Sequence, residues 1–180
     1  AHGLEEWERL REKASEIKDY TLSHLDELLL TFEEKALENG IRVHWAIDAR
    51  EHNQIVYQIL KERKIDFVVK SKSMLTEECG LNHYLEAQGI EVIETDLGER
   101  IVQWMHQKPS HIVLPAIHLK KGDIGEVFKE KLGLPLTDDA QLLTEAARQD
   151  MRKYFIASKV ALTGVNFGLA EEGAFVVCTN

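Results

Sequence analysis

The chain has 180 residues, of which 44% are apolar and 29% charged, and its formal net charge at pH 7 is −9. This length and composition are typical of one globular domain, alone or with a helical extension, that can bury a substantial core. The acidic balance without a basic cluster argues against a nucleic-acid-binding protein, and no apolar run approaches the length of a membrane-spanning helix, about 20 residues.

The first 40 residues have the apolar spacing of a helix. Apolar side chains recur at intervals of three and four residues from Trp7 through Leu25 to Ala36. Asn39-Gly40 then provides a typical helix stop. We therefore expect a long helical N-terminal extension over residues 1–40 and an α/β domain over residues 41–180.

The stretch Asp66–Glu94 predicts the fold class. Two short apolar runs, Phe67–Val69 and Ile90–Ile93, are rich in β-branched residues, and a segment with helical spacing and Thr76 as its N-cap separates them. A strand, helix, strand unit of this kind forms a right-handed parallel crossover. We therefore expect an α/β fold with a mostly parallel sheet flanked by helices.

The other segments extend this pattern on both sides. Before the central unit we expect a strand over Ile41–Ile47 and a helix that Asp48 caps, over about residues 49–64. After it we expect a short helix over 100–106, a strand over His111–Leu114, a helix capped by Asp123, and a long helix from Asp138 or Asp139 to about Ala161 with Phe155 and Ile156 on its inward side. Two strands, over 165–170 and 174–178, bring the sheet to at least five.

Lys70, Ser71, Lys72 and Ser73 directly follow the first strand of the central unit. Open α/β sheets bind ligands outside the carboxyl ends of their strands, and a helix follows this loop. Two ammonium groups and two hydroxyls there would suit a phosphate or a carboxylate. The alternative is a solvated turn, with lysines that point to water and serines that satisfy loop backbone groups.

The turn Glu171-Glu172-Gly173 is a second candidate site. Gly164, Asn166 and Gly173 lie near it in the sequence and leave room for a ligand to approach the backbone. A carboxylate at a strand end can act as a nucleophile or a base, although adjacent strand residues point to opposite faces, so at most one of the two would reach a site. The alternative is an exposed acidic hairpin turn.

Well-known catalytic and metal-binding motifs are absent. The sequence has no P-loop, no GxGxxG, no Ser/His/Asp set and no CxxC. Cys79 and Cys178 are far apart and supply neither a disulfide framework nor metal-ligand spacing, so we expect no metal site and a cytoplasmic location. His111 and His118 lack a second ligand at close spacing, which favours structural or exposed histidines.

Five strings, in chain order, resemble the LUD domain of the lactate utilisation protein B family, the bacterial iron–sulfur proteins of an L-lactate oxidation system: VHWAID, VVKSKSMLTEE, GIEVIETDLGERIVQW, PSHIVLPAIH and TGVNFGLAEEG. The N-terminal IKDYTLSHLDELLLTFEE resembles the helical lead-in of the same family, so the resemblance covers essentially the whole chain. It implies a fold similar to the ribose-5-phosphate isomerase and CoA-transferase class.

The resemblance also implies that a complete family member continues past Asn180 into a cysteine-rich, ferredoxin-like domain that binds two [4Fe–4S] clusters. This chain would then be a fragment without that domain, and two isolated cysteines cannot ligate such a cluster. We therefore expect no cofactor in this fragment.

Residues that match the family pattern are the ligand-binding candidates. They are Lys70, Ser71, Lys72, Ser73, Glu77, Thr163, Gly164 and Asn166, to which the small residue Gly173 is added. Glu171 also matches, whereas Glu172 stands where the family usually has threonine. In CoA-transferases a glutamate in a glycine-containing turn is the covalent nucleophile, which makes Glu171 the catalytic candidate by analogy of fold.

Two functions of different class follow. In the first, the chain is part of an oxidoreductase complex that converts L-lactate to pyruvate; it binds a small carboxylate or docks partner subunits, while clusters outside it carry electrons, and it is inactive alone. In the second, it is a self-sufficient enzyme on a CoA-transferase or sugar-phosphate isomerase scaffold that acts on a phosphorylated or thioester substrate. Independently of the function, parallel topology predicts that the Lys70–Ser73 loop and the 163–173 turn converge at one edge of the sheet and form a polar cleft.

Overall fold

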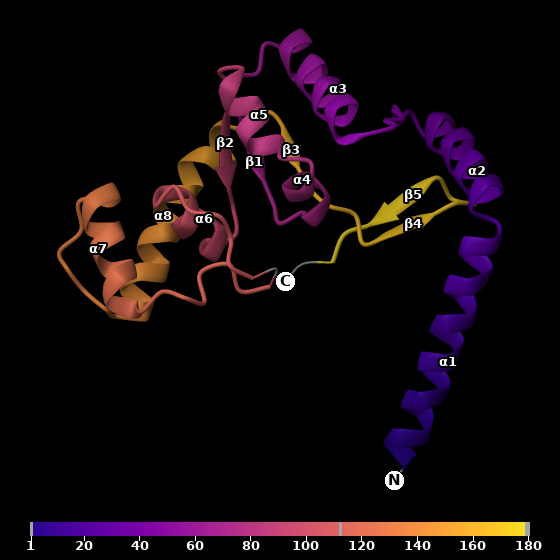
Figure 1. The fold of residues 1–180 in the computed structure, drawn as a ribbon, viewed down its shortest axis with the longest axis horizontal. Helices are drawn as coiled ribbons and strands as arrows, with labels where there is room; N and C mark the ends of the chain where they lie inside the picture. Colours follow the sequence, from indigo (N-terminus) through magenta and orange to yellow (C-terminus); the bar gives the residue numbers. More distant parts are fainter. Residues whose placement is uncertain (1, 112, 179–180) are drawn as a thin grey trace. The chain divides into compact units, whose positions relative to one another are not determined.

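The computed structural model describes residues 2–111 and 113–178. By its internal contacts the chain divides into two compact units (Figure 1). Unit 1 comprises residues 1–44 and 165–180, and unit 2 comprises residues 45–164. No helix in the described part of the chain is both long enough and apolar enough to cross a membrane.

Unit 2 is built on a small parallel sheet, which confirms the α/β class. Its strands are β1 (Phe67–Lys70), β2 (Glu91–Glu94) and β3 (Ala161–Leu162), in the order β2-β1-β3. The predicted crossover is confirmed, since β1 and β2 are parallel and α4 (Met74–Glu78) and α5 (Leu81–Ala87) connect them.

Helices cover both faces of the sheet, because successive apolar residues along each strand point to opposite faces. Val68 and Val92 pack with α5 and with α3 (Ala49–Glu62) in one buried cluster. Val69 and Ile93 point the other way and pack on Met151 of α8 (Ala140–Ala157). Successive strand residues face opposite sides of a sheet, so two apolar pairs bury both faces.

A second core lies among helices alone. Ile101 of α6 (Leu97–Trp104), Phe128 of α7 (Lys121–Leu132) and Leu143 of α8 are buried together. Trp104 meets Phe128 edge to face, with ring centroids 5.4 Å apart. α6 also contacts β2 and thereby connects this helical core to the sheet.

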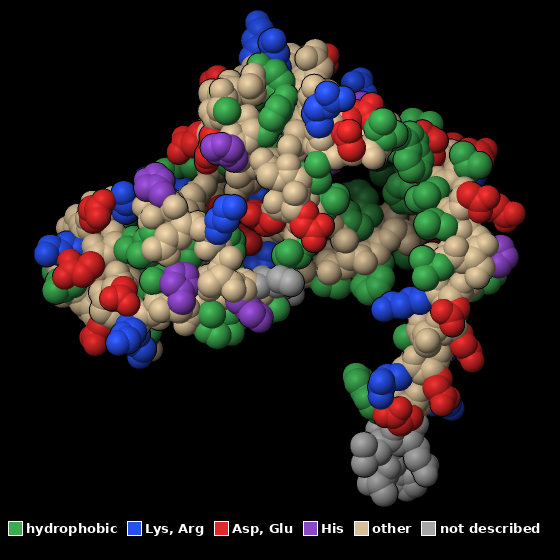
Figure 2. Space-filling view, viewed as in Figure 1, with side chains coloured by type: hydrophobic (Ala, Val, Ile, Leu, Met, Phe, Trp, Pro, Cys, Tyr) green, Lys and Arg blue, Asp and Glu red, His purple; other side chains and the backbone are tan. Residues whose placement is uncertain are grey.

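Unit 1 consists of two helices and a hairpin. They are α1 (His2–Ser23), α2 (Leu25–Glu38), β4 (Phe167–Leu169) and β5 (Ala174–Val176), and β4 and β5 pair antiparallel. Figure 2 shows apolar side chains on the surface of α2 and the hairpin. Leu30 of α2 and Phe167 of β4 are largely exposed. The predicted C-terminal strand pair is confirmed, but in a sheet of its own, so the expected single sheet of five strands is wrong.

The predicted continuous N-terminal helix is interrupted at His24. His24 has φ −125° and ψ 26°, outside the helical region. Just before it, the hydroxyls of Thr21 and Ser23 donate to the carbonyl oxygens of Ile17 and Asp19, four residues earlier. Hydroxyl bonds of this kind bend helices, which accounts for a break that apolar spacing alone does not reveal.

Two predicted strands do not form. Residues 41–46 are irregular, and Ile47 is 92% exposed, so the run lacks the buried face that a strand needs. Within the predicted strand His111–Leu114, the His111 ring nitrogen Nδ1 accepts hydrogen bonds from the backbone N–H groups of Val113 and Leu114, which makes a turn. Ile112 lies outside the described residues.

Several helix ends differ from the predictions. Asp48 and Asp139 cap α3 and α8 as expected, but Ser73 rather than Thr76 caps α4. Asp96 caps α6, which therefore begins at Leu97, before the predicted start at residue 100. Asp123, the predicted cap of α7, lies inside its first turn. Helix α8 ends at Ala157 rather than at about Ala161, and Ala161–Leu162 form β3.

Candidate functional site

The carboxyl edge of the parallel sheet gathers the predicted residues of unit 2. Lys70 ends β1 and continues into Ser71–Ser73, while Thr163 and Gly164 follow β3. The Ser71 hydroxyl donates to Thr163 Oγ1 at 2.8 Å. A Cβ on Gly164 would lie 3.4 Å from Ser73 Cβ, so the two segments are in contact. The structure thus brings together the loops after β1 and β3.

Lys70 occupies the centre of this edge, but its charge is already compensated. Its side chain is fully buried, and Nζ donates to Glu77 Oε1 at 2.9 Å and to Glu94 Oε1 at 2.7 Å. Burial alone would lower the pKa of Lys70, yet the charges of Glu94 and Glu77 outweigh it and raise the pKa above its ordinary value. Lys70 is therefore a permanent internal cation.

An amide and a further carboxyl group, those of Asn82 and Glu99, interact with Glu94. Asn82 Nδ2 donates to the same oxygen of Glu94 that Lys70 contacts. Burial, together with the neighbouring charge of Glu94, raises the pKa of Glu99 to about 8. Glu99 consequently keeps its proton at neutral pH and can donate it to Glu94.

Lys72 is the less buried lysine of the loop. Its Nζ lies 3.2 Å from Asp96 Oδ2 and donates to the Val113 carbonyl at 3.1 Å. The sequence predicts both lysines as free cations for an anion; in the structure both are paired with carboxylates of unit 2. An anion at this edge would therefore have to displace Asp96 or bind through Ser71, Thr163 and backbone N–H groups.

The three other predicted residues belong to unit 1, where two of them, Asn166 and Gly173, have close partners. Asn166 Oδ1 accepts from the Cys178 backbone N–H at 2.8 Å. Gly173, with φ +56°, lies against α2 so closely that a Cβ would come within 2.3 Å of the Lys35 carbonyl carbon. Glu171 is exposed in the turn. For these three residues, a site shared with Lys70–Ser73 stays a prediction.

Glu94, Glu99 and Asn82 are functional candidates that the sequence analysis does not identify. A signal for Glu94 was present, because the runs Val68-Val69-Lys70 and Val92-Ile93-Glu94 both end in a charge. In the parallel register Lys70 stands directly opposite Glu94. Opposite charges at matching ends of two apolar strands predict a buried ion pair.

The described residues contain no group of three or more His, Cys, Asp or Glu side chains arranged to hold a metal ion. Cys79 and Cys178 are free thiols, one in each unit. A [4Fe–4S] cluster needs four thiolate ligands, so the residues of this chain do not fit one.

Comparisons with known proteins agree over almost the whole chain. The model of the LUD domain family matches residues 29–180. The chain is 47% identical to lactate utilization protein B of Macrococcus caseolyticus, over 98% of the chain and 37% of that protein. It is 42% identical to lactate utilization protein B of Oceanobacillus iheyensis, over 100% of the chain and 38% of that protein.

A third relative has a different name. The chain is 41% identical to the uncharacterized electron transport protein YkgF of Escherichia coli K12, over 98% of the chain and 37% of that protein. The chain thus spans a little over a third of the length of these relatives. No solved structure matches it.

Proposed function

The chain belongs to the LUD domain family, and on that basis we propose that it is the LUD portion of a bacterial protein that takes part in lactate utilisation through electron transport. The observation that carries this proposal is the identity of 40–47% between nearly the whole chain and proteins named lactate utilization protein B. At the level of reaction, the proposal is oxidation of L-lactate to pyruvate by a complex of several subunits in the cytoplasm.

Within such a complex we assign this chain to binding rather than to electron transfer. Its two cysteines do not fit a [4Fe–4S] cluster, so the clusters, two in number, would reside in another part of the protein. The roles left to this chain are binding of a small carboxylate and docking of partner subunits.

The carboxyl edge of the sheet is the proposed carboxylate site. The hydroxyls of Ser71 and Thr163 lie there and are hydrogen-bonded to each other. Lys72 supplies a positive charge that a bound carboxylate could share with Asp96. Four other predicted residues would support this edge through their contacts with one another rather than bind the carboxylate directly: Lys70, Ser73, Glu77 and Gly164. Asn166, Glu171 and Gly173 complete the proposed set only if the hairpin turn reaches the same ligand.

A binding experiment on this chain tests the proposal. Pyruvate and L-lactate would be titrated into the protein while amide signals of β1, β3 and the loops after them are followed by NMR. Replacing Ser71 by Ala and Thr163 by Val should weaken binding about tenfold, since two polar contacts are lost. Thr31→Val, which removes an exposed hydroxyl of α2, is the matched control.

An activity measurement decides between this function and a self-sufficient CoA-transferase or isomerase. The exposed carboxylate of Glu171, in a glycine-containing turn, is the feature that favours the enzyme. We expect the chain alone neither to reduce an artificial electron acceptor with L-lactate nor to transfer an acyl group from a thioester. Turnover of a thioester or sugar phosphate that Glu171→Gln abolishes would establish the alternative.

A further inference from the structure

We propose that unit 2 carries a second ligand site, a pocket between α6 and α8 that binds an organic anion with an apolar body. The pocket has a volume of about 370 Å³, within the usual range for small-molecule sites, about 300–1,000 Å³. It lies next to Thr95, the residue that follows β2. This site is distinct from the carboxylate site proposed above, because its charged side chains come from α6 and α8 and none of Ser71, Lys72 and Thr163 lines it.

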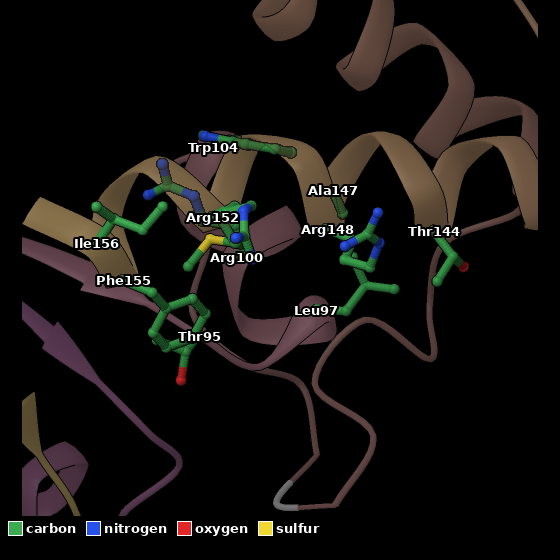
Figure 3. Close-up of a pocket in the computed structure, with 11 residues that line it drawn as sticks. Thr95, Leu97, Arg100, Trp104, Thr144, Ala147, Arg148, Arg152, Phe155 and Ile156 are labelled. Atoms are coloured by element: carbon green, nitrogen blue, oxygen red, sulfur yellow. The ribbon is translucent and has the colours of Figure 1, made fainter.

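The pocket differs from the rest of the protein in charge. The chain has 31 acidic and 22 basic residues, yet the charged residues lining this pocket are Arg100, Arg148 and Arg152, with no acidic side chain among them. Figure 3 shows the three arginines together, with Arg148 and Arg152 projecting from α8. An all-cationic lining in an acidic protein favours an anionic ligand.

The three guanidinium groups are compensated to different degrees. Arg100 Nη2 lies 3.9 Å from Asp150 Oδ2, and both side chains are buried. Arg148 makes a bidentate pair with Glu145, at 2.7 Å for both contacts. The side chain of Arg152 makes no hydrogen bond or ion pair with any described residue. Its charge is the one most available to a ligand, and an arginine fork matches the geometry of a carboxylate or a phosphate.

Arg100 supplies a buried donor that the protein leaves unused. The residue is 7% exposed, and its Nε has no hydrogen-bond partner. Nη1 donates to Gln103 Oε1 at 2.7 Å, and the guanidinium stacks on the Trp104 ring, 4.9 Å from the centroid. Gln103 and Trp104 therefore hold the group in one orientation. An unpaired buried N–H costs free energy unless a ligand or a water satisfies it.

The remaining walls define the rest of the ligand. Trp104, Phe155 and Leu97 line the pocket, and Figure 3 shows them around the arginines. Phe155 and Ile156 were predicted to face inward from α8, but they are 57% and 71% exposed. Exposed aromatic and aliphatic side chains beside fixed cations suit a molecule that joins a carboxylate or phosphate to an aryl or alkyl group.

An NMR titration of the whole chain tests this site. The probe is 4-phenylbutyrate, and the readout is the indole N–H signal of Trp104, which Trp104→Phe identifies among the three tryptophans. We expect saturable shifts with 4-phenylbutyrate and about tenfold weaker binding of 4-phenylbutyramide, which has the same body without the charge.

Two variants test whether the guanidinium of Arg152 binds the carboxylate of the ligand. Arg152→Gln should weaken 4-phenylbutyrate binding about fivefold or more and leave the amide unaffected. Arg50→Gln removes an exposed arginine from α3, outside the pocket, and should change neither. Equal affinity for acid and amide, or an unchanged affinity in Arg152→Gln, would overturn the proposal and leave only an apolar crevice.

Discussion

At the scale of single residues, the sheet edge is governed by one buried cation and its carboxylates. Lys70 and Glu94 stand opposite each other in the parallel register, and both side chains are almost completely buried. A buried pair gains little over apolar residues of the same size, but removing one partner leaves an uncompensated charge. The pair therefore specifies the arrangement of β1 and β2 more than it stabilises it.

The first prediction concerns the loss of Lys70. Lys70→Met should lower the free energy of unfolding by about 3–5 kcal/mol, since Glu94 is left buried without its cation. The double variant with Glu94→Gln should recover roughly half of that loss, because the orphaned charge is gone. Urea unfolding followed by circular dichroism measures both. Additive losses in the double variant would contradict this account.

The second prediction concerns pH and Glu99. Unfolded, its carboxyl releases the proton near pH 4.5, whereas in the folded protein burial raises the pKa to about 8. Between these values the folded state binds more protons than the unfolded state, so the free energy of unfolding contributed by Glu99 falls as pH rises. Glu99→Gln, which imitates the protonated acid, should nearly match wild type at pH 4.5 and exceed it by on the order of 4 kcal/mol at pH 8.

Unfolding experiments at several pH values between these limits give the comparison. Glu86→Gln, at an exposed position on α5, is the control and should show one constant difference from wild type. If the difference between Glu99→Gln and wild type also stays constant with pH, Glu99 is ionised in the folded protein and the assignment fails.

At the scale of elements, the predictions succeed where one local signal decides. Asp48 and Asp139 each precede a helix and accept backbone N–H bonds as expected, and the two apolar runs around the crossover become β1 and β2. Failures occur where a side chain competes with the pattern. His111 satisfies backbone N–H groups that a strand would have used, and Asp96 starts α6 ahead of Gly98. The spacing of apolar residues carries no information about such hydrogen bonds between side chains and the backbone, so it does not predict these local structures.

The third prediction compares two glycines of the same helix, α7. A Cβ on Gly125 would lie 2.1 Å from the Thr137 carbonyl oxygen, so Gly125→Ala must push apart α7 and the segment before α8. We expect a loss of about 2 kcal/mol or more. Gly122 has open space around its Cβ position, so Gly122→Ala should be neutral or stabilise by up to about 1 kcal/mol through helix propensity. Thermal unfolding of both variants measures the contrast; equal effects would show that α7 packs less closely.

At the scale of the whole molecule, the sequence predicts the fold class but not the division into units. Helical spacing indicates the N-terminal extension, and β-rich runs indicate the C-terminal strands. Nothing in either pattern indicates that residues 165–178 leave the parallel sheet and join α2, where Asn39 Nδ2 donates to the Glu172 carbonyl at 2.8 Å. That pairing depends on contacts more than 130 positions apart in the chain. The sheet edge is predictable because the topology of parallel strands places the loops after them at one edge. Of its charge pairs, the sequence signals Lys70–Glu94 through the strand ends, whereas the pairing of Lys72 with Asp96 depends on how the loops fold.

The last prediction follows from where the buried residues lie. Among the described residues, the three apolar cores are formed by side chains of unit 2, whereas the one buried apolar side chain of unit 1 is Ala36. Trp7, Leu30 and Phe167 of unit 1 are largely exposed. Burial of apolar surface supplies most of the stability of a fold, so unit 2 should hold its structure far more strongly than unit 1. Hydrogen exchange of the isolated chain should show slow amides in β1, β2 and α6 and amides at least about a hundredfold faster in α1, β4 and β5. Residues 45–164 produced alone should keep the slow amides of the intact chain, because their cores need no residue outside this range. If those amides exchange as in an unfolded peptide, the stability of unit 2 depends on unit 1, and the two would have to be treated as one cooperative structure.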